Sequence, residues 1–372
     1  MRLEHTRLLM KHLFFASLFA LTVAPTAFAN EDGAYLDAPY PNLVRAIDDA
    51  HLAKNLKGKS DTNAVIDLMT PVRSQGSRGT CSIFSAAALI EGLMNIKGTG
   101  NSETDLSEEY LQYNVNAGST SDGSYATKNF SAIRTNGMAD ESVLPYIGDN
   151  WVSFQDSTAQ KRCGYLTSTA KDSCLIVHHD PAQRYRTDAE LLDETKQWYD
   201  PEFVAARNDG LQFKFDNLSS STYSTIYNTT QVKQMLDRGI PVILEQTFYY
   251  GAWNHRTADS LNISRNLDHW SKGIVGYPFP GSMDAQQSPT KRAGHSILLV
   301  GYDDSVVIDF PVKMADGTTK TFKLKGVYYF KNSWGTGSFG LDAEIDGVSR
   351  PGYGTMTQQY AHDYGSFYYF NL

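Results

Sequence analysis

The sequence predicts an α+β protein whose front half is mostly helical and whose back half is mostly strand. Before about residue 240, apolar residues recur at helical spacing, most clearly in the stretch that begins at Cys81. After about residue 240, short segments are rich in β-branched and aromatic residues, and Asp316-Gly317 between two of them is typical of a hairpin turn. We therefore predict a helical lobe at 71–230 and a β-rich lobe at 231–372.

The individual elements follow from the same patterns. Thr80 is placed to cap the helix that starts at Cys81, Gly98 to end it, and Ser107 to cap the next helix. Residues 217–230 are polar and of low complexity, which predicts an exposed loop. Further helices are expected at 42–58, 126–137, 187–198 and 229–239, and strands at 240–250, 294–304, 305–314, 318–334 and 366–372.

The first 29 residues have the pattern of a signal peptide. Three basic residues precede the apolar run LFFASLFALTVA, and Ala27-Phe28-Ala29 is a typical cleavage signal. The run is too short to span a bilayer, and no later stretch is apolar enough to do so. We expect residues 1–29 to be removed, the mature chain to be periplasmic or secreted, and residues 30–70 to form an N-terminal extension or short propeptide.

Composition limits the classes of partner. The 372 residues carry a net charge of −8, and no basic cluster stands out, which argues against nucleic acid and anionic membranes. No CxxC pair, HExxH motif or EF-hand loop is present, so we expect no metal and no cofactor. His178-His179-Asp180 is interpreted as a polar surface loop.

The three cysteines are the most informative residues for an exported chain. Cys163 and Cys174 are close enough in sequence to form a disulfide around a small loop, which leaves Cys81 as the odd one. Cys81 is then a packing residue, half of another disulfide, or a nucleophile. At a helix start, the helix dipole would lower the pKa of its thiol, and Arg78 nearby would act in the same direction.

A thiolate nucleophile needs a proton donor and donors for an oxyanion. Gln75 lies six residues before Cys81, where a flexible loop can turn its side-chain amide back toward the reacting carbonyl oxygen. His295 begins an apolar strand, and Asn332 follows another strand in KNSWGTG. The Asn332 amide is suited to orient the imidazole, and Trp334 to cover their hydrogen bond.

Together these segments resemble the papain-like cysteine peptidases, as a bacterial-type exported member with insertions. TPVRSQGSRGTCSIFSAAALIEG is similar to the active-site loop and central helix of that family, GHSILLVGYDD to its histidine strand and YYFKNSWGTG to its asparagine motif. The resemblance implies a two-lobe fold with the active-site cleft between a helical lobe and a curved antiparallel, barrel-like sheet. It also implies that Cys81 is the nucleophile, His295 the acid and base, Asn332 the orienting group and Gln75 an oxyanion donor.

The sequence departs from the family pattern around the nucleophile. Ser82 replaces an aromatic residue, Arg78 replaces a half-cystine, and Gly123-Ser124 stands where a glycine pair backs the substrate. We expect Gly123, Ser124 and Trp334 to contact substrate. His295 and Asn332 follow Cys81 by 214 and 251 residues, compared with about 130–150 in the family. Insertions at about 147–230 and a hairpin at about 303–325 would account for the difference.

We therefore expect a monomeric peptidase that hydrolyses protein or peptide substrates through an acyl-thioester. One alternative is an inactive binding protein with this fold, whose usual signature is a lost catalytic residue. Another is a thiol acyl-transferase of the transglutaminase type, which orients its histidine with aspartate, whereas this chain offers Asn332.

Overall fold

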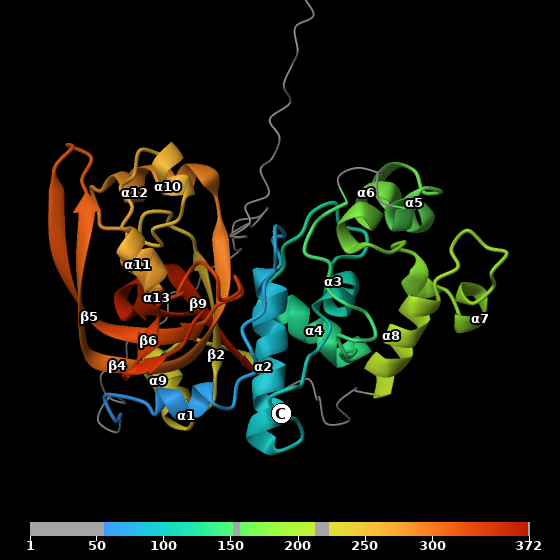
Figure 1. The fold of residues 1–372 in the computed structure, drawn as a ribbon, viewed down its shortest axis with the longest axis horizontal. Coiled ribbons are helices and arrows are strands. Elements are labelled where there is room, and N and C mark those ends of the chain that lie inside the picture. The colour runs from blue at the N-terminus through green and yellow to red at the C-terminus, as the bar shows by residue number, and fades with distance from the viewer. Residues whose placement is uncertain (1–55, 152–156, 213–222, 371–372) are drawn as a thin grey trace, which may run out of the picture.

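The computed structural model describes residues 56–151, 157–212 and 223–370. A β-rich lobe and a helical lobe lie side by side, and α2 (Cys81–Lys97) runs between them (Figure 1). The predicted α+β class and two-lobe arrangement are therefore confirmed. The predicted signal peptide, the first part of the 30–70 extension and most of the helix expected at 42–58 lie outside the described residues.

Most helices of the front half surround α2 or extend the helical lobe away from it (Figure 1). After α1 (Thr62–Ile66) and α2 come α3 (Glu108–Asn116), α4 (Ala126–Asn136), α5 (Ser157–Cys163), α6 (Ser168–Val177), η2 (Gln183–Tyr185), α7 (Asp188–Leu191) and α8 (Pro201–Gln212). The back half contains α9 (Thr229–Asp237), α10 (Thr257–Ser260), α11 (Leu267–Ser271), α12 (Met283–Gln287), η3 (Ser288–Lys291) and α13 (Gln358–Tyr364).

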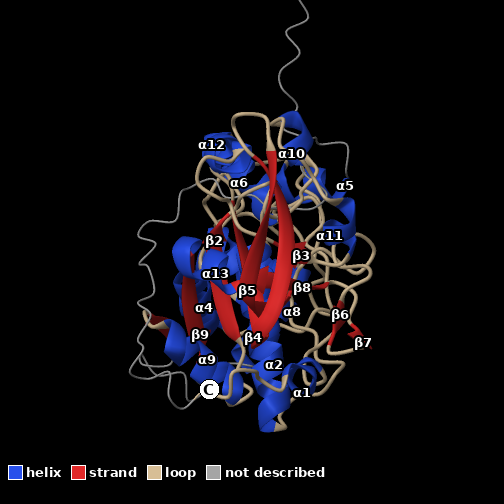
Figure 2. Ribbon diagram, turned by 90° about the vertical axis from the view of Figure 1, so that its left-hand side faces the viewer, coloured by secondary structure: helices blue, strands red, loops and turns tan. Residues whose placement is uncertain are grey.

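The strands of the β-rich lobe form a seven-stranded sheet (Figure 2). Its order is β1 (Tyr223–Ile226), β9 (Gly365–Phe370), β2 (Val242–Thr247), β4 (Gly294–Lys313), β5 (Thr319–Lys331), β8 (Tyr353–Thr357) and β3 (Ile274–Val275). The pairs are antiparallel except β3 with β8, and no pairing among the described strands closes the sheet into a barrel. A separate hairpin pairs β6 (Glu344–Ile345) with β7 (Val348–Ser349).

The longest hairpin joins β4 to β5 through the predicted Asp316-Gly317 turn. Gly317 has a φ of 86°, a backbone conformation that glycine adopts without steric cost. The two strands expected at 294–304 and 305–314 are one continuous strand, because an irregularity in the pairing between Asp303 and Val307 absorbs the extra residues without ending the ladder.

Local signals were correct for some element boundaries and wrong for others. Gly98 ends α2 in the left-handed conformation, and the Ser107 hydroxyl caps α3 by accepting from the Tyr110 amide. Thr80 makes no capping hydrogen bond, because its hydroxyl pairs with that of Tyr146 instead.

Two segments also differ from their predicted secondary structure. The last part of the loop expected at 217–230 forms β1 and the start of α9, since β9 supplies the pairing partner of β1. The helix expected at 187–198 is only the short α7.

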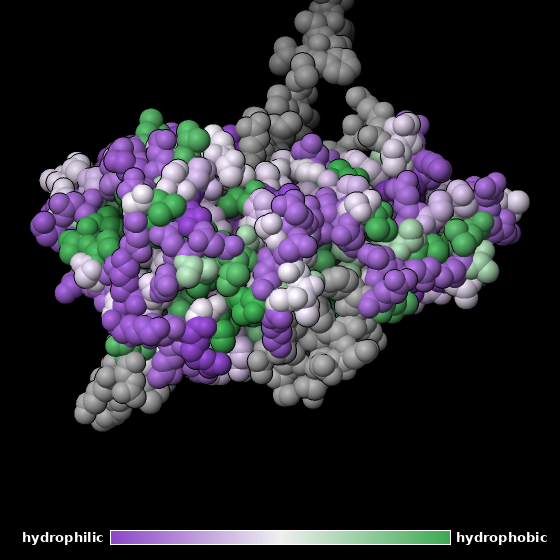
Figure 3. Space-filling view, turned by 60° about the horizontal axis from the view of Figure 1, so that its bottom comes forward, coloured by the Kyte–Doolittle hydropathy of each residue, from purple (hydrophilic) through white to green (hydrophobic). Residues whose placement is uncertain are grey.

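The main hydrophobic core lies where α2 meets the sheet. Side chains on all sides of α2 are buried, including Ile83, Ala87 and Ile90, because the sheet covers one side and α3 and α4 another. On the face in Figure 3, apolar side chains lie in small groups between hydrophilic ones. Among the described residues, no helix has the combination of length and apolar character that a membrane span requires.

A disulfide links Cys163 to Cys174 and joins α5 to α6. It closes a loop with a sequence separation of 11 residues. The double substitution Cys163→Ser/Cys174→Ser should lower the free energy of unfolding by about 2–3 kcal/mol, because the unfolded chain regains the freedom of that loop. Urea denaturation measures this difference. Reductant should move the wild-type midpoint toward that of the double variant and leave the double variant unchanged; an equal midpoint for oxidised wild type and double variant would contradict the prediction.

Candidate active site

Cys81 is the first residue of α2 and its side chain is fully buried. It is the free cysteine of the described residues, because Cys163 and Cys174 are bonded to each other. The disulfide alternative for Cys81 therefore falls away. Its position places the sulfur at the N-terminal end of a 17-residue helix, where the helix dipole favours negative charge.

His295 and Asn332 lie together in the structure. His295 is near the start of β4, and Asn332 directly follows β5, the antiparallel neighbour of β4. The Nε2 of His295 lies 2.8 Å from the Oδ1 of Asn332, and both residues are buried. Because an amide oxygen can only accept, this contact fixes the hydrogen on Nε2 and leaves Nδ1 as the basic nitrogen. Nδ1 is buried and has no hydrogen-bond partner among the residues that the structure describes.

The backbone of β4 brings this pair to Cys81. The amide of Ser296, the residue after His295, donates a hydrogen bond to the sulfur of Cys81. One turn along α2, the hydroxyl oxygens of Ser85 and Ser296 lie 2.6 Å apart. The start of the histidine strand is therefore held directly against the first turns of the cysteine helix.

A buried polar chain fixes Asn332 from the other side. Lys331, the residue before it, donates through Nζ to the Thr70 hydroxyl at 3.0 Å. Thr70 donates in turn to the carboxylate of Glu91 on α2. Burial lowers the pKa of Lys331 to about 8, against the opposing effect of Glu91. The end of β5 is thus tied to α2 by groups that have no contact with bulk water.

Trp334 covers the His295–Asn332 hydrogen bond. Its ring stacks on the imidazole, with 4.6 Å between centroids and 25° between planes. Trp253 and Phe248 contact the same imidazole edge-on. These aromatic side chains surround the imidazole that makes the hydrogen bond. Only 6% of the Trp334 surface is exposed, so little of this side chain is open to a substrate and most of it contacts other aromatic rings.

Gln75 lies in the loop before α2 with its side-chain amide held at both ends. Its Nε2 donates to the Arg78 carbonyl at 2.7 Å, and its Oε1 accepts from the Ser333 hydroxyl at 2.7 Å. The backbone of Gln75 also accepts a donor, the Tyr146 hydroxyl, at 2.9 Å. The Gln75 side chain therefore links Ser333, the residue after Asn332, to Arg78, which lies three residues before Cys81.

Gly123 and Ser124 lie on the helical-lobe side of Cys81. Gly123 has a φ of 105°, so this turn favours glycine. The Ser124 hydroxyl lies 2.6 Å from that of Ser82, the residue after the cysteine. Ser82 and Ser124, two of the residues that depart from the family pattern, therefore pair with each other.

The expected lowering of the Cys81 pKa is not found in the substrate-free site. Burial raises the pKa of the Cys81 thiol to about 12, and the backbone hydrogen bond from Ser296 only partly offsets this effect. Burial likewise lowers the pKa of His295 to about 4, although the hydrogen bond to Asn332 raises it. Arg78 does not supply the expected help, because two carboxylates neutralise its charge. Both shifts favour the neutral forms of the thiol and the imidazole.

The site contains buried polar residues that sequence reasoning missed. His178 and His179 were interpreted as part of a surface loop, but both are fully buried: His178 pairs with Glu109 and His179 with Asp200. Asp180 is buried too. In the sequence, only Arg78 pointed to these buried residues. It stands where the family has a half-cystine beside a buried helix, and a buried charge at that position requires buried polar partners.

Known proteins resemble this chain in sequence and in fold. Residues 59–243, about half of the chain, match the model of the papain family cysteine proteases. The chain belongs to the papain family. The match ends before His295 and Asn332, so their placement rests on the geometry of β4 and β5.

Individual members of the papain family resemble shorter parts of the chain. Cysteine proteinase 1 of Entamoeba histolytica is 39% identical over 85 residues, which are 22% of this chain and 27% of that protein. Cathepsin K of Gallus gallus is 35% identical over 83 residues, 22% of this chain and 24% of that protein. The chain thus spans about a quarter of the length of these relatives.

A solved structure extends the likeness to the fold of the whole chain. Xylellain, a cysteine protease from Xylella fastidiosa, covers 92% of this chain and 97% of its own, with a TM-score of 0.52 and 18% identity. At that identity the likeness shows the papain-like fold alone.

The lowered pKa of His295 can be measured directly. In a Cys81→Ala background, NMR titration of the imidazole should give a pKa near 4, well below the ordinary 6.5. The further substitution Asn332→Ala should lower it again, because the hydrogen bond that raises it is lost. Since the folded pKa lies below the unfolded one, His295 should destabilise the protein as pH falls from about 6.5 through 4. A pKa that stays unchanged or rises in the double variant would refute the assigned hydrogen bond.

Proposed function

We propose that the protein is an exported cysteine peptidase that hydrolyses peptide bonds with Cys81, His295 and Asn332. The observation that carries the proposal is the buried His295–Asn332 hydrogen bond beside the N-terminus of the Cys81 helix. The other ring nitrogen of His295 has no hydrogen-bond partner within the described part of the chain. This is the arrangement that a nucleophile, its base and an orienting group require.

In the proposed reaction, the Cys81 sulfur attacks the carbonyl carbon of the scissile peptide and its proton passes to Nδ1 of His295. Because burial favours the neutral form of both groups, proton transfer is proposed to accompany or directly precede attack. Nδ1 then gives the proton to the leaving amine, and the acyl group remains on sulfur as a thioester. His295 next takes a proton from water, whose oxygen attacks the thioester and releases the carboxylic acid and the Cys81 thiol.

The oxyanion is proposed to lie between the backbone amide of Cys81 and the side-chain amide of Gln75. The contacts to Arg78 and Ser333 support this role for Gln75, because they hold its amide group in one orientation before substrate arrives. Gly123 and Ser124, across from Cys81, are proposed to receive the substrate backbone.

Export is proposed from the first 29 residues and from the disulfide. The segment has the three-part pattern of a signal peptide, and disulfides persist mainly in oxidising compartments. Removal of residues 1–29 would leave Asn30 as the first residue of the mature protein, which N-terminal sequencing of exported material can determine.

Labelling with an epoxide or vinyl-sulfone inhibitor tests the proposed nucleophile. The mature wild-type protein should gain one inhibitor, located on Cys81 by mass spectrometry of peptides, and should cleave a peptide library. Cys81→Ala should abolish both signals, because no other described cysteine has a free thiol. Asn332→Ala should keep the label site but lower kcat. Folded wild type that resists labelling would overturn the proposal, and a label that persists in Cys81→Ala would mean that the nucleophile is another residue.

A further inference from the structure

Arg78 is a fully buried arginine three residues before Cys81. All of its side-chain nitrogens face acceptors, so the guanidinium is held in one position. Without these acceptors, burial of its charge would be very costly. Nη1 donates to Glu109 at 3.0 Å and to the Ile147 carbonyl at 3.1 Å, Nη2 to Asp122 at 3.0 Å and to the Ile176 carbonyl at 2.7 Å, and Nε to Asp122 at 3.4 Å.

The acceptors come from separate segments that enclose the loop before Cys81. Glu109 belongs to α3, and Asp122 directly precedes Gly123, which we propose to contact substrate. Ile147 and Ile176 belong to the segment that we interpret as an insertion. A single side chain thus connects the nucleophile loop, the opposite wall of the site and the insertion.

Two contacts carry this connection to the reacting groups. The Arg78 carbonyl accepts from the Gln75 side-chain amide at 2.7 Å. The carboxylate of Asp122, which binds the guanidinium, also accepts from the backbone amide of Gly79 at 3.3 Å. Arg78 therefore fixes both the orientation of Gln75 and the turn that leads into Cys81.

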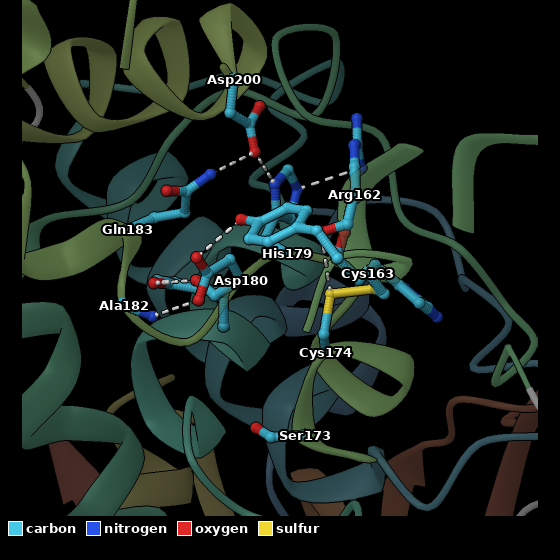
Figure 4. Close-up of a disulfide and its surroundings, with 12 residues drawn as sticks. Arg162, Cys163, Ser173, Cys174, His179, Asp180, Ala182, Gln183 and Asp200 are labelled. Carbon is cyan, nitrogen blue, oxygen red and sulfur yellow. Dashed lines mark hydrogen bonds and ion pairs between the residues drawn. A yellow bond between two sulfur atoms is a disulfide. The ribbon is translucent and has the colours of Figure 1, made fainter. Parts of the chain in front are cut away.

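The described part of the insertion near Arg78 is cross-linked by a disulfide and by buried polar contacts. The disulfide joins α5 to α6, and Arg162, next to Cys163, donates to the His178 carbonyl at 3.3 Å. Figure 4 shows Arg162 also directed at His179, which lies between it and Asp200. His178 in turn contacts Glu109 at 2.8 Å, so the chain of contacts returns to the partner of Arg78.

The charges of this cluster suit a permanent connection. Burial by itself lowers the pKa of Arg78, but Glu109 and Asp122 raise it above its ordinary value. Burial raises the pKa of Glu109, yet Arg78 and then His178 bring it down to about 2. The guanidinium and the Glu109 carboxylate thus remain charged across the range in which enzymes work.

We propose that Arg78 is a positioning residue, which holds Gln75 and the Cys81 backbone amide in place to receive the oxyanion by clamping their loop to the insertion. This role rests on the proposed peptidase function. It explains how the loop keeps its geometry although the half-cystine of the family is absent.

The test compares two reactions of Cys81 that differ in their need for an oxyanion donor. Cleavage of a peptide amide passes through an oxyanion, whereas alkylation by iodoacetamide needs only the thiolate. In Arg78→Met, kcat should fall by about a hundredfold, the effect of losing one oxyanion donor, while the alkylation rate changes by less than about threefold. Arg78→Lys keeps the charge without the fork and should recover part of kcat.

Arg207→Met is the matched control. Arg207 lies in the same lobe, pairs with Asp188 and the Arg186 carbonyl, and has no contact with the loop, so both rates should stay at the wild-type value. Asp122→Asn provides a milder change if Arg78→Met does not fold, and it should lower kcat more than the alkylation rate. Both kcat and the alkylation rate are normalised to the concentration of folded protein whose Cys81 can be alkylated.

Each remaining outcome refutes one specific claim. Equal loss of kcat and alkylation in Arg78→Met, or no loss of either, would overturn the positioning role while the peptidase function stands. Wild-type protein that is alkylated at Cys81 but cleaves no peptide would overturn the proposed function and this role with it.

Discussion

The structure depends on the close contact between the first turns of α2 and the start of β4. Cys81 and His295 are 214 residues apart in the chain, and this contact brings their elements together. The residues at the contact are small, Ser85 on the helix and Ser296 on the strand, and their hydroxyl oxygens lie 2.6 Å apart. A larger side chain at either position would push the strand away from the helix.

The contact restrains the site because other interactions fix both β4 and the start of α2. On the strand side, β4 lies between β2 and β5, and Asn332 at the end of β5 is tied to α2 through Lys331, Thr70 and Glu91. On the helix side, the loop before Cys81 is held by the buried Arg78 cluster. The same burial that fixes the geometry raises the pKa of the thiol and lowers that of the imidazole, which favours their neutral forms.

The sequence was sufficient for the parts of the site that rest on local pattern. The apolar periodicity after Cys81, the strand that His295 begins and the strand that Asn332 follows are visible in the residues themselves. The partners of Arg78 were not, because they come from segments far apart in the chain and only the fold brings them together. For the same reason, polar residues such as His178 and His179 suggested a surface loop, although hydrogen bonds to carboxylates at a distance in sequence allow their burial. β1 was missed because its partner β9 lies at the other end of the chain.

The central claim is that α2 and β4 together assemble one reacting unit from Cys81, His295 and Asn332. The crystal structure of the mature protein after reaction with a vinyl-sulfone inhibitor measures this directly. We expect a covalent bond from the Cys81 sulfur to the inhibitor, Nδ1 of His295 directed at the adduct, and Nε2 still on Asn332 at close to the 2.8 Å of the substrate-free protein. An adduct on another residue, or an imidazole turned away from both Cys81 and Asn332, would contradict the account.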